Sequence, residues 1–321
     1  MPQRTAPQHT ASLSHPFQRN LFPGKLTLRR LFRSRWLLSW AAIAATTAGT
    51  WQSFVLPATS QALLPYTLEL DNPTLEAQGE VLLQDAVQLL RFEQYALALP
   101  RIKLATQLAP QDFRTWFLLG SLYVQQEEVG EGIEVLERAL SLVPPDATED
   151  RPSLLFMLGS AYFQDEQYLK ARDAFVEGLA QEDDSAEAWF DLGNTDYQLR
   201  NYSEAIAAYQ QAIDLEEKFW PAINNIGLVQ YEQGQLDAAV SQWEASLEVD
   251  AQAAEPMLAI AIARYRQGQL PEAIEIAQRA LSLDPNYADL EFLKLNLWGE
   301  RLLEDTVQFF DLPEMREFLS S

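Results

Sequence analysis

Residues 187–212 read EAWFDLGNTDYQLRNYSEAIAAYQQA, and this stretch decides the fold. Small residues such as Gly193 and Ala205 allow two antiparallel helices to approach closely, while Trp189 and Tyr209 fill the space around that contact. A single helix hairpin of this kind cannot bury its own apolar face, so it has to stack on further copies of itself. The stretch therefore predicts a chain built from repeated helix hairpins.

The same pattern recurs along the chain at a period of 34 residues. Counting forward from Gly193 leads to Gly227, and counting back leads to Gly159. Farther upstream, the spacing from Gly120 to Gly159 is 39 residues, and the five extra residues fall in the turn-rich segment 144–150. The period thus tolerates one insertion between repeats.

The order of a large residue, Leu-Gly, a small residue, an aromatic residue and another small residue over 34 positions resembles the tetratricopeptide repeat. The resemblance implies an all-α protein, an α-solenoid of about six helix hairpins. Residues 288–321, where apolar and charged positions are interspersed, are expected to form a C-terminal capping helix and tail that cover the last repeat. The expected repeats span residues 79–112, 113–151, 152–185, 186–219, 220–253 and 254–287.

The N-terminal part of the chain differs from the repeats in composition. Residues 1–35 are rich in Pro, Gln, Ser, Thr and Arg without an apolar period, so we expect a disordered basic arm. Residues 36–56 carry no charge, and a helix of this length spans roughly 30 Å, the thickness of a bilayer core. Residues 36–57 are therefore a candidate transmembrane helix, followed by a linker over residues 58–78.

Two other interpretations of residues 36–57 stay open. Ser60-Gln61-Ala62 places small residues where a signal peptidase cleaves, which would make the segment part of a signal peptide. A buried N-terminal helix of a soluble protein is the third interpretation, although a core helix seldom runs this long without polar periodicity.

Charge is divided unevenly along the chain. Seven basic and no acidic residues precede Glu69, whereas residues 69–321 carry 16 basic against 46 acidic side chains. The positive-inside bias predicts a cytoplasmic N terminus and repeats on the lumenal or periplasmic side of a thylakoid or plasma membrane. A surface this acidic repels phosphate backbones, so nucleic acid is not an expected partner.

The sequence offers no catalytic constellation. It contains no Cys, and its two His residues, His9 and His15, lie in the basic arm, so the repeats cannot form a Ser-His-Asp or Cys-His arrangement. The 13 Gly residues form no phosphate-binding loop. Acidic clusters such as Glu182-Asp183-Asp184 are expected to be solvated turns instead of metal ligands. We expect no enzymatic activity, no cofactor and no metal site.

In tetratricopeptide domains the fifth, ninth and twelfth positions of a repeat face a concave groove, and the resemblance implies the same role here. Ser121 and Ser160, at ninth positions, offer hydrogen bonds, and a tyrosine hydroxyl favours water or a partner. No fifth or ninth position is basic, which argues against the gripping of a terminal carboxylate that chaperone-binding members use. The candidate groove residues for a protein or peptide partner are Phe117, Phe156, Phe163, Phe190, Asn194, Tyr197, Asn224, Tyr231 and Tyr265. For Phe156 and Phe190, packing between adjacent helices is an equal alternative.

The membrane segment, the acidic repeats and the closing NLWGERLL at residues 296–303 resemble cyanobacterial and plastid thylakoid repeat proteins that assist photosystem or pigment-protein assembly. The resemblance implies a membrane-anchored scaffold for the assembly or biogenesis of a photosynthetic membrane protein complex. The alternative is a general cell-envelope factor in secretion or cell-wall assembly.

Overall fold

The computed structural model describes residues 72–144 and 150–320. The predicted basic arm and the membrane segment at residues 36–57 lie outside the described residues. Within the described residues every regular element is a helix, and none of these helices is long and apolar enough to cross a bilayer. The described chain divides into two units, residues 72–110 and residues 111–320.

The first unit is a single helix hairpin formed by α2 (Asn72–Arg91) and α3 (Tyr95–Leu108). Helix α2 begins seven residues before Gly79, the predicted start of the first repeat, so the linker expected over residues 58–78 is too long at its C-terminal end. The extra residues 72–78 are mostly exposed, and no burial pattern therefore marks them as helical in the sequence.

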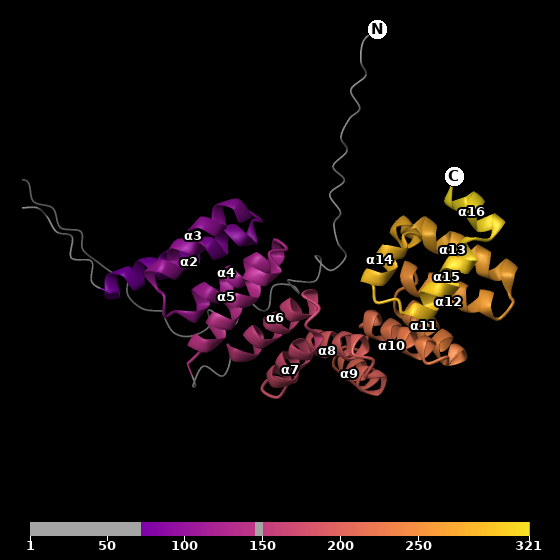
Figure 1. The fold of residues 1–321 in the computed structure, drawn as a ribbon, viewed down its shortest axis with the longest axis horizontal. Coiled ribbons are helices and arrows are strands. Elements are labelled where there is room, and N and C mark those ends of the chain that lie inside the picture. The colour runs from indigo at the N-terminus through magenta and orange to yellow at the C-terminus, as the bar shows by residue number, and fades with distance from the viewer. Residues whose placement is uncertain (1–71, 145–149, 321) are drawn as a thin grey trace, which may run out of the picture. The chain divides into compact units, whose positions relative to one another are not determined.

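The second unit opens with a series of hairpins, each pairing a first helix with a second helix (Figure 1). Each first helix begins within one residue of the start that the 34-residue period places at residues 113, 152, 186, 220 and 254. The pairs are α4 (Phe113–Gln125) with α5 (Val129–Leu142), α6 (Arg151–Gln164) with α7 (Tyr168–Leu179), α8 (Ala186–Gln198) with α9 (Tyr202–Leu215), α10 (Trp220–Glu232) with α11 (Leu236–Val249), and α12 (Ala254–Arg266) with α13 (Leu270–Leu283).

The two helices of a hairpin touch at the glycine of the first helix. A Cβ atom on Gly193 would lie 2.5 Å from the ring of Tyr209, and one on Gly227 would lie 2.5 Å from the indole of Trp243. Both rings are fully buried. The space that the missing side chain leaves is therefore filled by the aromatic residue of the second helix, which is the reason for the Leu-Gly motif.

Each hairpin turn contains one residue with left-handed backbone at the same place in the period. The φ angle is +57° at Glu166, +60° at Arg200 and +78° at Gly234. The turn is closed by a hydrogen bond such as that from the amide of Asn201 to the carbonyl of Asp196, at 2.8 Å. This is the Schellman arrangement that commonly ends a helix.

The chain after the sixth repeat forms several short helices, whereas the sequence analysis predicted one capping helix. Helix α16 packs on α13 and buries Met315, so part of the segment does cover the last repeat. Helix α15 takes another course and packs on α10 and α12, the first helices of repeats five and six. The elements are η2 (Pro285–Ala288), α14 (Leu290–Leu295), α15 (Glu300–Phe310) and α16 (Pro313–Leu319).

The path of α15 follows from an early turn. After Gly268 the period places the next left-handed residue at position 302, but the chain turns at Leu297, where φ is +64°. Helix α14 is therefore only six residues long. The chain consequently returns across the preceding first helices instead of completing a seventh hairpin.

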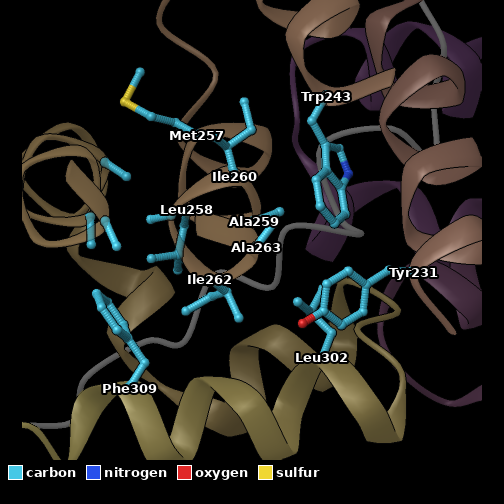
Figure 2. Close-up of a cluster of buried hydrophobic side chains, with 14 of the residues drawn as sticks. Tyr231, Trp243, Met257, Leu258, Ala259, Ile260, Ile262, Ala263, Leu302 and Phe309 are labelled. Carbon is cyan, nitrogen blue, oxygen red and sulfur yellow. The ribbon is translucent and has the colours of Figure 1, made fainter. Parts of the chain in front are cut away.

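The last two repeats share a buried core with α15 (Figure 2). Leu302 and Phe309 project from α15 toward the layer that contains Tyr231, Leu258 and Ile262. All five side chains are buried in one apolar cluster. Helix α15 thus belongs to the packed interior of repeats five and six.

Candidate functional site

The positions expected to face the groove fall into two groups. On α10 and α12, Tyr231 and Tyr265 contact α15, whereas on α4, α6 and α8 the phenylalanine rings at these positions stay half-buried. We call these two regions the covered groove and the open groove.

The covered groove is held to α15 by a buried polar contact. The Tyr231 hydroxyl donates a hydrogen bond of 2.6 Å to Asp305 of α15, and Arg266 pairs with the other oxygen of that carboxylate at 3.3 Å. Tyr231 is only 2% exposed. Burial, together with the neighbouring carboxylate, raises the pKa of Tyr231. The partner that this hydroxyl was expected to seek is therefore supplied by the chain itself.

Glu232 caps the start of α15. Its carboxylate accepts hydrogen bonds from the amides of Arg301 at 3.2 Å and Leu302 at 3.1 Å. A negative charge at this end of a helix is favourable because the first amides have no partner within the helix. Gly299 allows the close approach, since a Cβ there would lie within 2.5 Å of the Glu232 side chain.

Two further contacts extend the covered groove. The rings of Tyr265 and Phe309 lie 5.3 Å apart, so this candidate residue also contacts α15. Near the start of α12, Trp298 donates from Nε1 to Glu255 at 3.1 Å. Burial raises the pKa of Glu255 to about 7, while hydrogen bonds from Trp298 and its neighbours oppose that rise.

In the open groove the rings rest partly on the second helices. Phe156 lies against Gly178, where an added Cβ would come within 2.5 Å of the ring. Phe190 lies between Tyr209 and Phe219, with ring centroids 5.7 and 5.2 Å away. These two rings, together with Phe117 and Phe163, remain half-buried. One part of each ring is therefore packed while another part is available.

A polar pair joins α6 to α8. Ser160 on α6 donates a hydrogen bond of 3.3 Å to Asp191 on α8. Desolvation raises the pKa of Asp191 to about 7, although the bond from Ser160 lowers it. Both side chains are half-buried, so this pair can exchange hydrogen bonds with an incoming segment.

Three other candidate residues are used by the fold. Asn194 accepts hydrogen bonds from the Tyr209 hydroxyl and from Asn225, both at 2.9 Å, and Asn224 donates to Asn225 at 3.0 Å. This buried network joins repeats four and five. Tyr197 is 7% exposed, and its hydroxyl is enclosed. These side chains consequently do not form an open surface in the structure.

The chain matches the model of the tetratricopeptide repeat over residues 85–147, 156–220 and 224–288. The chain belongs to the tetratricopeptide repeat family. No match is found among curated proteins.

Solved structures of other tetratricopeptide repeat proteins have a similar fold. PilF of Pseudomonas aeruginosa is 14% identical, and the match covers 70% of this chain and 99% of PilF with a TM-score of 0.55. The Cut9-Hcn1 hetero-tetramer of the APC/C is 18% identical, and the match covers 73% of this chain and 49% of that chain with a TM-score of 0.53. MamA of Desulfovibrio magneticus RS-1, from residue 41 onward, is 17% identical. The match covers 54% of this chain and 96% of that chain with a TM-score of 0.50. At this level of identity these matches show the fold alone.

Asp191 and Glu232 are not among the candidate residues predicted from the sequence. Neither residue occupies a fifth, ninth or twelfth position of its tetratricopeptide repeat. An acidic residue next to a groove position on a first helix was the available signal, since Glu232 directly follows Tyr231. The helix that Glu232 caps, however, was not expected on this face.

Proposed function

We propose that this protein is a non-catalytic, membrane-anchored scaffold that holds a segment of a partner protein in the open groove while a membrane protein complex is assembled. The observation that carries the proposal is the set of half-buried rings at groove positions of α4, α6 and α8. Tetratricopeptide solenoids use their concave surfaces for binding, and partly exposed aromatic rings are strong anchors at interfaces.

The charge of the second unit favours a particular partner chemistry. Residues 111–320 carry 13 basic against 40 acidic side chains, and Asp191 directly follows Phe190 on α8. An extended or helical segment that combines apolar and basic side chains would complement both features. Such a segment would bury its apolar residues on the rings while its basic residues approach the acidic solenoid.

The membrane part of the proposal rests on the uncharged residues 36–56 and on the basic arm before them. In this proposal the N terminus lies in the cytoplasm, and the repeats lie on the lumenal or periplasmic side. The proposed complex is photosynthetic and the proposed membrane a thylakoid, because of the resemblance carried by residues 296–303. If the protein instead acts in the cell envelope, the capture experiment below should recover secretion or cell-wall proteins.

The proposal predicts that Phe117→Ala combined with Phe163→Ala weakens capture of the native partner from solubilised membranes. Loss of two aromatic anchors should cost about 2 kcal/mol or more, which is roughly a thirtyfold loss of affinity. The measurement is quantitative recovery of co-purifying proteins on the full chain in detergent.

Leu169→Ala is the matched control, because Leu169 on α7 is 70% exposed and lies outside the open groove. Circular dichroism should show that both proteins keep their helices. Unchanged recovery by a folded double variant would exclude the open groove as the binding surface.

A further inference from the structure

Helix α15 differs from the other long helices of the second unit because it is not half of a repeat hairpin. It lies across α10 and α12 on their groove positions. Within a repeat, the helices meet through small and apolar side chains such as Ala239 and Ala273, which are fully buried. The contact with α15 also includes charged groups, at its first turn and at Asp305 in its middle, and charged groups are common in the contact with a bound ligand.

The polar contacts of α15 lie at defined points along it. Glu300 pairs with Arg200 at 3.2 Å beside the first turn, where Glu232 caps the helix. One turn later, Asp305 is bound by Tyr231 and Arg266. These contacts fix the direction and the register of the helix.

The apolar contacts of α15 follow the spacing of a helix that lies in a groove. Leu302, Thr306 and Phe309 are buried, and Asp305 is buried between them. The opposite face, which includes Glu304, is exposed. Contacts at i, i+3, i+4 and i+7 are the anchors with which an amphipathic helix binds a groove.

The connection into α15 is under backbone strain. Leu297 has a φ angle of +64°, a conformation that is unfavourable for a residue with a Cβ. Leu297 is nevertheless buried in the cluster that joins α8, α9 and α10. Strain of this kind persists only where the surrounding contacts hold it.

We propose that α10 and α12 form a helix-binding site and that α15 is its intramolecular ligand. The external partner is an amphipathic helix that presents Leu, Asp and Phe with the spacing of Leu302, Asp305 and Phe309, and it binds by displacing α15. This site is distinct from the open groove, so the failure of either proposal leaves the other testable.

Tethering determines how the site responds to a partner. A ligand on a short connection has an effective concentration of about millimolar, so it keeps the site closed against weak competitors. The apparent dissociation constant of an external helix is the intrinsic constant divided by the fraction of open sites. Weakening α15 alone should therefore strengthen the binding of an added helix.

The test uses a fluorescent peptide with the sequence of residues 297–319 and the full chain in detergent. Leu302→Ala with Phe309→Ala in the chain weakens the resident helix and leaves α10 and α12 unchanged. This variant should bind the peptide at least about tenfold more tightly than the native chain. Equal affinity for the two folded proteins would overturn the proposal.

A disulfide between the start of α15 and α10 should hold α15 in the site. Glu232→Cys with Gly299→Cys places two thiols where a Cβ on residue 299 would meet the side chain of residue 232, and the native chain has no Cys. The oxidised protein should not bind the peptide, and reduction should restore binding. Equal binding by the oxidised and reduced forms would contradict displacement.

Two peptide variants test the pattern itself. Asp305→Asn in the peptide should weaken binding to the Leu302→Ala, Phe309→Ala chain at least about tenfold, because Tyr231 and Arg266 lose a charged acceptor. Glu304→Gln, on the exposed face, should leave binding unchanged. Equal effects of the two changes would overturn the proposed register.

Hydrogen exchange on the unaltered chain checks the proposal without any mutation. Amides of α15 should exchange faster than those of α12, because α15 opens separately from the repeats. Equal protection of the two helices would show that α15 is a fixed part of the fold.

Discussion

At Gly193 the stack has no room for a side chain, because the ring of Tyr209 occupies the space that a Cβ would need. We predict that Gly193→Leu lowers the free energy of unfolding by about 1 to 3 kcal/mol or more, since the ring or the helix must move. The melting temperature of the full chain should fall by at least a few degrees.

Gly130→Ala is the control for this change. Gly130 is also helical, in the first turn of α5, but a Cβ there would meet nothing within 4 Å. Its melting temperature should stay constant or rise slightly, since alanine favours helix. A Gly193→Leu protein that melts with the native chain would show that the helices are not in contact at this position.

The raised pKa of Glu255 predicts that the stability of the fold depends on pH. Burial raises its pKa in the folded chain to about 7 from an ordinary value of 4.5. The folded protein therefore keeps this proton at pH values where the unfolded chain has lost it. The stabilisation is present below about pH 4.5 and is lost as the pH rises to about 7.

Glu255→Gln should make the melting temperature less dependent on pH between 5 and 7, because the amide cannot titrate. The amide oxygen can still accept the hydrogen bond from Trp298. Comparison of the two proteins over this range isolates Glu255, since other groups, including Asp191, remain in both. Parallel curves would show that Glu255 titrates normally.

At the scale of the elements, the hairpin turn repeats its geometry more faithfully than its sequence. Repeats five and six place Gly234 and Gly268 at the left-handed position, whereas the preceding turns use Glu127, Glu166 and Arg200. Glycine adopts positive φ without steric cost, whereas the Cβ atom of other residues makes this conformation unfavourable. The earlier turns therefore contain strain that the later turns avoid.

We predict that Glu166→Gly stabilises the second unit by about 0.5 to 1 kcal/mol, the strain relieved less the added chain entropy. The melting temperature should rise by a few degrees. Glu166→Ala, which keeps a Cβ, should give no such rise. An unchanged melting temperature for Glu166→Gly would mean that the turn relaxes by other means.

For the whole molecule, the division of charge predicts topology. Seven basic residues and no acidic ones precede Glu69, and the described repeats are strongly acidic. If the repeats are periplasmic, we predict that protease added to sealed, right-side-out vesicles digests them. If they are lumenal, sealed vesicles with the lumen inside should protect them. Repeats that are digested from the cytoplasmic face would refute the orientation and leave the solenoid intact.

The repeated hairpins could be predicted from the sequence, because each depends on contacts between residues close in the chain. The distance from Gly193 to the ring that fills its space is 16 positions, and the same spacing returns in the next repeat at Gly227 and Trp243. Periodicity records such local contacts. The candidate groove positions likewise came from position within the repeat, and the sequence left open whether Phe156 and Phe190 face the groove or pack between helices.

The burial of the covered groove could not be predicted from the repeat pattern. Tyr231 and Asp305 lie 74 positions apart, and no period connects them. The early turn at Leu297 redirects α15 over α10 and α12, so residues that the repeat pattern assigns to a ligand surface are buried by the chain itself. A periodic signal specifies how neighbours stack, whereas the place of a non-repeating helix depends on long-range packing that the period does not record.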